Sequence, residues 1–211
     1  MAQHSHAEFL RRVASDQVGP VTLIHGDEAL LLDECVNAVI EKSVDPAVRE
    51  FNLDIIDGTR IDIREVLAKA SSFPMMAERR VVVVKTFERL VSGEKAREIF
   101  GGYIARPMDS TRLVLVAESP DFRRKPYNDL KKFGDIVECK PPWDNEIPSW
   151  IVDRAKLFQK TINVDAARML QAYVGDSLMA IHRELDKLSS YVGERPEITE
   201  DDVSAVAGAS R

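Results

Sequence analysis

Runs of apolar residues alternate with amphipathic stretches as far as residue 140. Two of these runs, 81–84 and 113–116, contain only Val and Leu. Continuous apolar runs are typical of strands that are covered on both faces, as in a parallel sheet. The pattern predicts five strands, at residues 21–25, 51–56, 80–85, 112–117 and 136–140.

The stretches between these strands have helical periodicity. They predict four helices, at residues 28–43, 61–72, 93–106 and 126–133. In the first of them, Leu32, Val36 and Val39 belong to one apolar stripe, which is the face that would pack on the sheet. Five strands joined by helical crossovers predict an α/β domain over residues 1–140, with a doubly wound parallel sheet between two layers of helices.

The pattern changes after Pro141-Pro142, because no further strand is predicted and apolar residues recur only at helical spacing. Helices are predicted at residues 145–159, 164–174, 177–192 and 200–207. Asn163 is a candidate N-cap, and Thr199 with Asp202 three residues later resembles a capping box. Residues 141–211 should therefore form a small all-helical domain.

Composition narrows the class of protein without identifying it. The chain has 211 residues, of which 45% are hydrophobic and 30% charged, as in an ordinary globular protein. The net charge of −6 argues against a dedicated nucleic-acid coat. Cys35 and Cys139 are isolated, so neither a disulfide nor a zinc site is expected and a reducing cytoplasm fits best. No run is long enough to predict a membrane-spanning helix, and we expect no contact with a membrane.

A phosphate-binding loop is missing from the place where the fold would put it. A buried strand, Gly26 and a helix form the setting of the motif G-x-x-x-x-G-K-[ST]. Its second glycine, lysine and hydroxyl residue are replaced here by Leu31, Leu32 and Asp33. Without the lysine, and with acidic residues near the helix N-terminus, the segment should repel a nucleotide phosphate.

Several local sequences together resemble one family. The α/β domain followed by a helical lid is the plan of AAA+ modules, and the local sequences are similar to those of the delta subunit of the bacterial DNA polymerase III clamp loader. The resemblance runs from about residue 8 to residue 208, and it depends on the order and spacing of residues 23–28, 72–83, 150–151, 175–178, 183–188 and 198–203.

This resemblance implies an AAA+-like subunit that does not hydrolyse ATP, needs no cofactor and is a non-catalytic component of the polymerase holoenzyme. Two further positions agree with it. Ala117 stands where an ATPase has its first magnesium-binding acid, and Leu178 stands where it has an arginine of the lid. The family's C-terminal collar domain, which holds the other loader subunits, would begin where this sequence stops at Arg211. We therefore expect this chain to be a monomer.

Met75 and Met76 lie between a predicted helix and a predicted strand. Without a family they could simply cap the core over the sheet edge. By resemblance, they match two bulky residues that the delta subunit inserts into a pocket of the sliding clamp, and methionine suits such an adaptable contact. Phe73 could supply the aromatic surface that is common in the family. Arg79 could flank the contact or protect the next strand from aggregation.

A basic cluster follows the fourth predicted strand, and it consists of Arg123, Arg124, Lys125, Lys131 and Lys132. It could touch the phosphates of DNA within the assembled loader, or it could be a solvated helix face. His4 and His6 form H-x-H, but in a terminus that we expect to be frayed, so no metal site is predicted.

The sequence thus favours a clamp-loader delta subunit that binds the clamp (the beta subunit), opens its ring and leaves ATP turnover to its partners. Two alternatives remain at this point. One is an active AAA+ ATPase with an unusual loop, and the other is a nucleic-acid-binding or scaffold module unrelated to replication.

Overall fold

The computed structural model describes residues 3–208. The chain divides between Lys140 and Pro141 into two compact units, each with its own hydrophobic core. The first unit is an α/β domain, which holds every candidate site residue except Leu178. The second unit is mainly helical.

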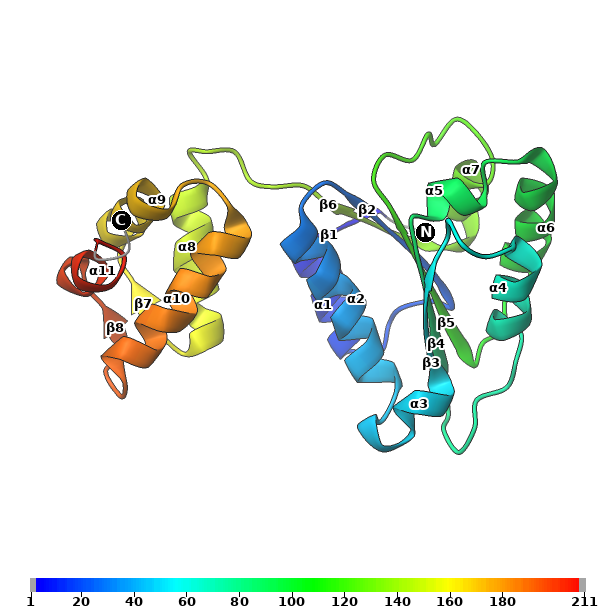
Figure 1. Ribbon diagram of the computed structural model, residues 1–211, viewed down its shortest axis with the longest axis horizontal. Coiled ribbons are helices and arrows are strands. Elements are labelled where there is room, and N and C mark those ends of the chain that lie inside the picture. Colours follow the sequence, from blue (N-terminus) through cyan, green and yellow to red (C-terminus); the bar gives the residue numbers. More distant parts are fainter. Residues whose placement is uncertain (1–2, 209–211) are drawn as a thin grey trace. The chain divides into compact units, whose positions relative to one another are not determined.

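A parallel sheet of six strands forms the centre of the first unit, counted over the described residues (Figure 1). The strand order is β1-β6-β2-β5-β4-β3, and every neighbouring pair is parallel. The strands are β1 (Gln3–Ser5), β2 (Val21–Gly26), β3 (Leu53–Asp57), β4 (Arg80–Lys85), β5 (Thr111–Ala117) and β6 (Asp135–Cys139). The predicted α/β class with a parallel sheet between helices is confirmed, with one strand more than expected.

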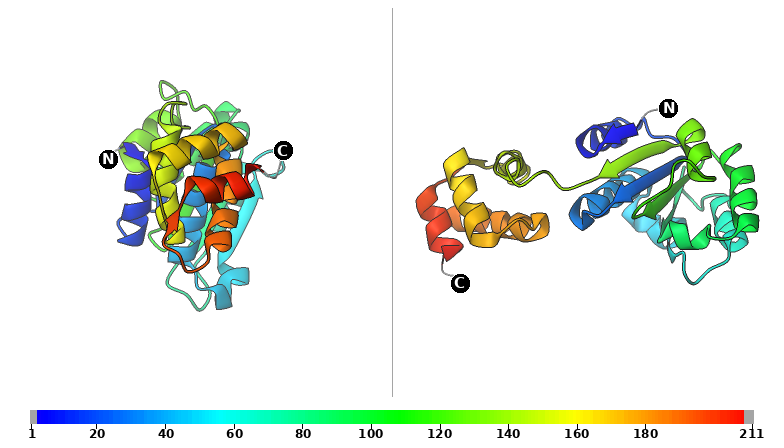
Figure 2. Two further views of the ribbon diagram at one scale, coloured as in Figure 1. Left: turned by 90° about the vertical axis from the view of Figure 1, so that its left-hand side faces the viewer. Right: turned by 90° about the horizontal axis from the view of Figure 1, so that it is seen from above.

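Helices cover both faces of this sheet (Figures 1 and 2). One face carries α1 (His6–Ala14) and α2 (Ala29–Ser43), and the short helices η1 (Pro46–Val48) and α3 (Arg49–Asn52) lead from α2 to β3. The other face carries α4 (Ile63–Ala70), α5 (Phe87–Leu90), α6 (Glu94–Ile104) and α7 (Tyr127–Phe133).

The continuous apolar runs are explained by this double cover. In β4, Val82 and Val84 belong to the core that includes Phe87 and Phe100. The alternate residues Val81 and Val83 are equally buried, and α2 packs against β4. Successive side chains of a strand point to opposite faces, so a strand with helices on both sides needs apolar residues at every position.

The sixth strand corrects the expectation of a frayed N-terminus. Residues 3–5 pair with β6, and the His4 side chain is buried with its ring nitrogens 3.1 Å from Glu8 Oε1 and 3.2 Å from Asp135 Oδ1. The strand is short and polar, so it has no apolar pattern by which it could be predicted. Parallel pairing and the buried histidine–carboxylate contacts hold it instead.

Elsewhere in the first unit the element ends shift by one or two residues, and short helices appear that were not predicted. The strand expected at 51–56 begins at Leu53, because Phe51 and Asn52 close α3. The helix α5 was not predicted, since it occupies a single turn directly after β4.

The second unit contains α8 (Ile147–Ala155), η2 (Lys156–Phe158), α9 (Val164–Val174), α10 (Leu178–Val192) and α11 (Glu200–Val206). The N-cap at Asn163 is confirmed, because its Oδ1 accepts the Ala166 N–H at 2.8 Å. The capping box of Thr199 and Asp202 is also confirmed. The expectation of no strand after residue 140 is wrong, since the two-residue strands β7 (Thr161–Ile162) and β8 (Glu197–Ile198) pair in parallel. They are too short to show a period.

Candidate functional site

The loop between α4 and β4, residues 71–79, presents its large apolar side chains to solvent. Phe73 is 77% exposed, Met75 55% and Met76 80%. The alternative that the two methionines cap the core is therefore wrong. Exposed large apolar residues that follow one another on a single loop are unusual unless they meet a partner.

The backbone of this loop is held by a residue of another element. Asn52, at the end of α3, is fully buried. Its Oδ1 accepts the N–H of Met75 at 2.8 Å, and its Nδ2 donates to the Met75 carbonyl at 2.8 Å and to the Val48 carbonyl at 3.0 Å. The next residue, Met76, has a left-handed backbone with φ of 51°, which is uncommon for a residue other than glycine.

Arg79 closes the loop with an ion pair. Its guanidinium donates two hydrogen bonds to the carboxylate of Asp16, at 2.5 and 2.8 Å, in the segment that follows α1. These bonds lower the pKa of Asp16. Arg80 is buried and lies 2.6 Å from Asp54. Both arginines thus hold the base of the loop, and Arg79 is less available to a partner than the sequence suggested.

The exposed apolar residues of the first unit concentrate around this loop. Among the described residues up to 140, six large hydrophobic side chains are exposed, and five of them lie on α3, β3 or the loop. These five are Phe51, Ile55, Phe73, Met75 and Met76. We call this set the apolar patch. Asn52 joins α3 to the loop, and β3 is the edge strand of the sheet.

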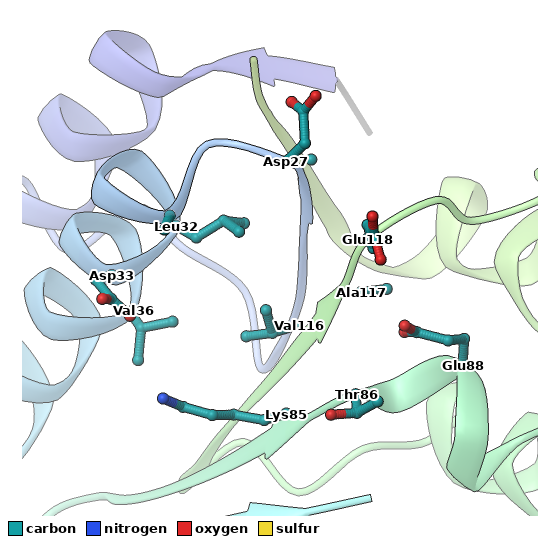
Figure 3. A pocket seen from close by; sticks show the side chains of 12 residues that line it. Asp27, Leu32, Asp33, Val36, Lys85, Thr86, Glu88, Val116, Ala117 and Glu118 are labelled. Atoms are coloured by element: carbon teal, nitrogen blue, oxygen red, sulfur yellow. The ribbon is translucent and has the colours of Figure 1, made fainter. Parts of the chain in front are cut away.

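A second feature is a crevice of about 400 Å³ at the carboxyl ends of β2, β4 and β5 (Figure 3). This is the end of a parallel sheet at which ligands usually bind. Leu32 and Asp33 line the crevice together with Gly26, whereas Leu31 is buried in the core and is not part of the lining. Leu32 thus lies where a nucleotide site needs its lysine.

The charges of the crevice oppose an anionic ligand. Its lining carries four carboxylates, from Asp27, Asp33, Glu88 and Glu118, and one cation, Lys85, within the described part of the chain (Figure 3). The carboxylate of Glu28 accepts the Leu30 N–H at 3.1 Å and so caps α2 where a phosphate would otherwise bind. The residues that line the crevice do not fit a nucleoside triphosphate.

Gly26 has a structural task in this crevice. Its φ is 139°, and a Cβ placed on it would lie 2.0 Å from the carbonyl oxygen of Cys139 on β6. The close approach of β6 therefore explains why this residue is glycine, without any bound phosphate.

The thiols of Cys139 and Cys35 are free and buried, with their Sγ atoms 3.9 Å apart.

The basic cluster is exposed. It does not form one helix face, so the alternative of a solvated helix face is wrong for the cluster as a whole. Arg123, Arg124 and Lys125 lie in the loop after β5, and Lys131 and Lys132 lie in the last turn of α7. Arg123 and Arg124 both contact Asp121, at 2.8 and 3.4 Å, and the Arg123 hydrogen bond lowers the pKa of that carboxyl from 3.8 to about 2. The Lys131 ammonium lies 4.7 Å from the centre of the Phe122 ring.

Leu178, the remaining residue of the predicted nucleotide site, begins α10 and is buried.

No helix within residues 3–208 is long and apolar enough to cross a membrane. No group of three or more potential metal ligands occurs in that range either.

Sequence reasoning missed Asn52 and Asp16, the two residues that hold the exposed loop. Asn52 carried a usable signal, because asparagine is disfavoured in strands and it interrupted a predicted one. Asp16 carried none, since its partner Arg79 is 63 positions away in the sequence.

The sequence matches one protein family over more than half of its length. The family model described as "DNA polymerase III, delta subunit" matches residues 23–140. A curated relative from Bacillus subtilis (strain 168), the DNA polymerase III subunit delta, is 36% identical over 203 residues, which are 92% of this chain and 58% of the relative. A probable DNA polymerase III subunit delta from Aquifex aeolicus (strain VF5) is 25% identical over 198 residues, 89% of this chain and 54% of the relative.

A solved structure of the same family also matches this chain. The DNA clamp loader delta protein of Bacillus subtilis matches with a TM-score of 0.82 and 33% identity, over 95% of this chain and 62% of that one. The RuvB Holliday junction branch migration motor of Thermotoga maritima matches with a TM-score of 0.51 at 17% identity, over 97% of this chain and 66% of that one, which shows a shared fold alone. The chain spans between half and two thirds of the length of its curated relatives.

Proposed function

Because the chain belongs to the DNA polymerase III delta-subunit family, we propose that it binds the ring-shaped sliding clamp of the polymerase and favours the open ring. The observation that carries this proposal is the exposed pair Met75 and Met76 on a loop whose backbone is fixed. Methionine side chains adapt to an apolar pocket, and burying them on binding removes apolar surface from water.

Ring opening on this account needs no chemistry within the chain. A ligand shifts a conformational equilibrium only by the difference between its affinities for the two states. The subunit opens the ring if it binds the open clamp more tightly than the closed one. The acid-lined crevice supports the division of labour in which partner subunits of the loader bind and hydrolyse ATP.

The assembled loader also has to meet DNA, and the exposed basic cluster is the surface of this chain that suits phosphates. Lys125, Lys131 and Lys132 are exposed. The two arginines share Asp121, which offsets part of their charge. DNA contact by the lysines would be independent of base sequence and would weaken steeply with salt.

Replacing Met75 and Met76 together by Ala tests the clamp contact. A buried anchor typically costs ~2 kcal/mol or more when it is truncated. We expect the double variant to bind the cognate clamp at least ~30-fold more weakly, which is the factor that such a loss implies. The measurement is a fluorescence titration of labelled clamp.

Leu157→Ala is the matched control, because Leu157 is also an exposed large apolar residue but lies in η2 of the second unit. The Leu157→Ala variant should bind the clamp with the same affinity as the unmodified chain. A double variant that binds the clamp as tightly as the control would remove Met75 and Met76 from the proposed contact.

A further inference from the structure

We propose that Asn52 is a positioning residue for the clamp contact, which holds the methionine loop in its binding conformation before the clamp arrives. The inference rests on the proposed function, because it concerns the way in which Met75 and Met76 are presented. Asn52 itself is fully buried, so its role would be to hold the loop and not to touch the clamp.

The side chain of Asn52 acts as a bracket for a single residue of the loop. It accepts the N–H and donates to the C=O of the same residue, Met75, both at 2.8 Å. The N–H and C=O of one residue point to the same side when the backbone is extended, as in a hydrogen-bonded pair of strands. The bracket therefore satisfies both backbone polar groups of Met75 with one buried side chain.

The rest of the loop depends on this bracket. Within the described residues, Asn52 makes the only hydrogen bonds to the backbone of residues 73–78. On the far side of the bracket, Met76 holds a left-handed conformation that a free methionine seldom adopts. One buried amide thus supplies the hydrogen bonds that hold the backbone at the two methionines, between the base of the loop and its tip.

The Asn52 side chain is itself held in place by a further hydrogen bond. The second proton of the Asn52 amide is donated to the Val48 carbonyl at 3.0 Å, so one hydrogen bond fixes the side chain on its own helix while the other two join it to the loop. A site is held accurately when its supporting side chains are themselves locked by packing and hydrogen bonds. A loop that is already ordered loses less conformational entropy when it binds, and the affinity rises accordingly.

A simpler role for Asn52 is stability alone, since buried polar groups are normally hydrogen-bonded. The two roles differ in a measurable way. If Asn52 acts through the methionines, its effect on clamp affinity must disappear when the methionines are absent. If it only supports the fold, its effect should be the same in both backgrounds.

The test is a double-mutant cycle with the cognate clamp. We expect Asn52→Ala to weaken clamp binding about tenfold, which corresponds to about 1.4 kcal/mol. In the Met75→Ala, Met76→Ala background the same change should alter affinity less than twofold. Ile104→Val, a conservative change of a buried residue on α6, controls for general destabilisation and should leave clamp affinity unchanged.

A second measurement needs no variant and covers the case in which Asn52→Ala fails to fold. Amide hydrogen exchange of the unmodified chain should show a protected Met75 N–H between the rapidly exchanging amides of Phe73 and Met76. Met75 exchange as fast as that of Met76 would overturn the bracket.

The outcomes separate the two proposals. If the methionine double variant binds normally, the proposed clamp contact fails. If the double variant loses binding but Asn52→Ala binds normally, or weakens binding equally in both backgrounds, only the positioning role fails.

Discussion

At Gly26 the strand β2 runs closer to β6 than any side chain would allow. The position looks like the first glycine of a phosphate-binding loop, yet the reason for the glycine is the carbonyl of Cys139. A residue that resembles part of a ligand site can thus remain for packing when the ligand chemistry is missing. The same sequence letter has two physical explanations, and only the three-dimensional contacts distinguish them.

Gly26→Ala should destabilise the first unit. The added Cβ would meet the backbone of Cys139 at 2.0 Å, and alanine also resists a φ of 139°. We expect the free energy of unfolding to fall by about 2 kcal/mol or more. Urea denaturation followed by circular dichroism measures the change. Gly102→Ala is the control, because a Cβ at that exposed helical position meets nothing within 4 Å. An equally stable Gly26→Ala protein would contradict the packing explanation.

The crevice should not bind ATP. Leu32 lies where the phosphate-binding lysine would be needed, and four acidic residues belong to the crevice lining. Calorimetric titration with MgATP should give no saturable heat. Lys85→Ala provides the decisive comparison, since Lys85 is the one cation of the described lining. Saturable binding that Lys85→Ala abolishes would restore the alternative of an active ATPase.

At the scale of elements, the apolar period predicted what lies in the core and failed where polar contacts hold the chain. The strands β4 and β5 were evident from their valine and leucine runs, since only strands covered on both faces need them. The strand β1 could not be predicted from apolar residues, because the contact between the buried His4 ring and the Asp135 carboxylate stabilises it. The methionine loop could be located in the sequence, whereas its bracket on α3 depends on a contact 23 positions away.

The capping box of α11 makes the second unit sensitive to acid. Arg195 donates to Asp202 at 2.7 Å, and this bond lowers the carboxyl pKa from 3.8 to about 2. A lowered folded-state pKa gives stability that is full above the unfolded pKa and is lost as the pH falls through the folded one. The loss therefore falls between about pH 4 and pH 2.

Asp202→Asn should lower the stability of the second unit at neutral pH and flatten its pH dependence in that interval. Both tryptophans of the chain, Trp143 and Trp150, lie in this unit, so their fluorescence reports its unfolding selectively. Asp201→Asn is the neighbouring control, because Asp201 is exposed. An unchanged acid dependence in Asp202→Asn would show that other groups cause it.

At the scale of the whole molecule, the chain is a family member whose apolar patch and degenerate crevice lie on different parts of one sheet. The apolar patch lies on α3, the edge strand β3 and the loop before β4, and the crevice lies at the carboxyl ends of β2, β4 and β5. Under the proposed function, this α/β fold serves as a scaffold for a protein contact rather than as a nucleotide site. Fold alone would not have indicated this, because similar modules carry out different functions.

The proposed ring opening can be tested directly with two forms of the clamp. One is the closed ring, and the other is a clamp whose subunit interface has been weakened by substitution so that it stays open. We predict that the chain binds the opened form at least about tenfold more tightly, within the range of typical coupling energies. A ligand with equal affinity for both states shifts nothing. Equal affinities, or tighter binding of the closed ring, would contradict the proposal that this subunit opens the clamp.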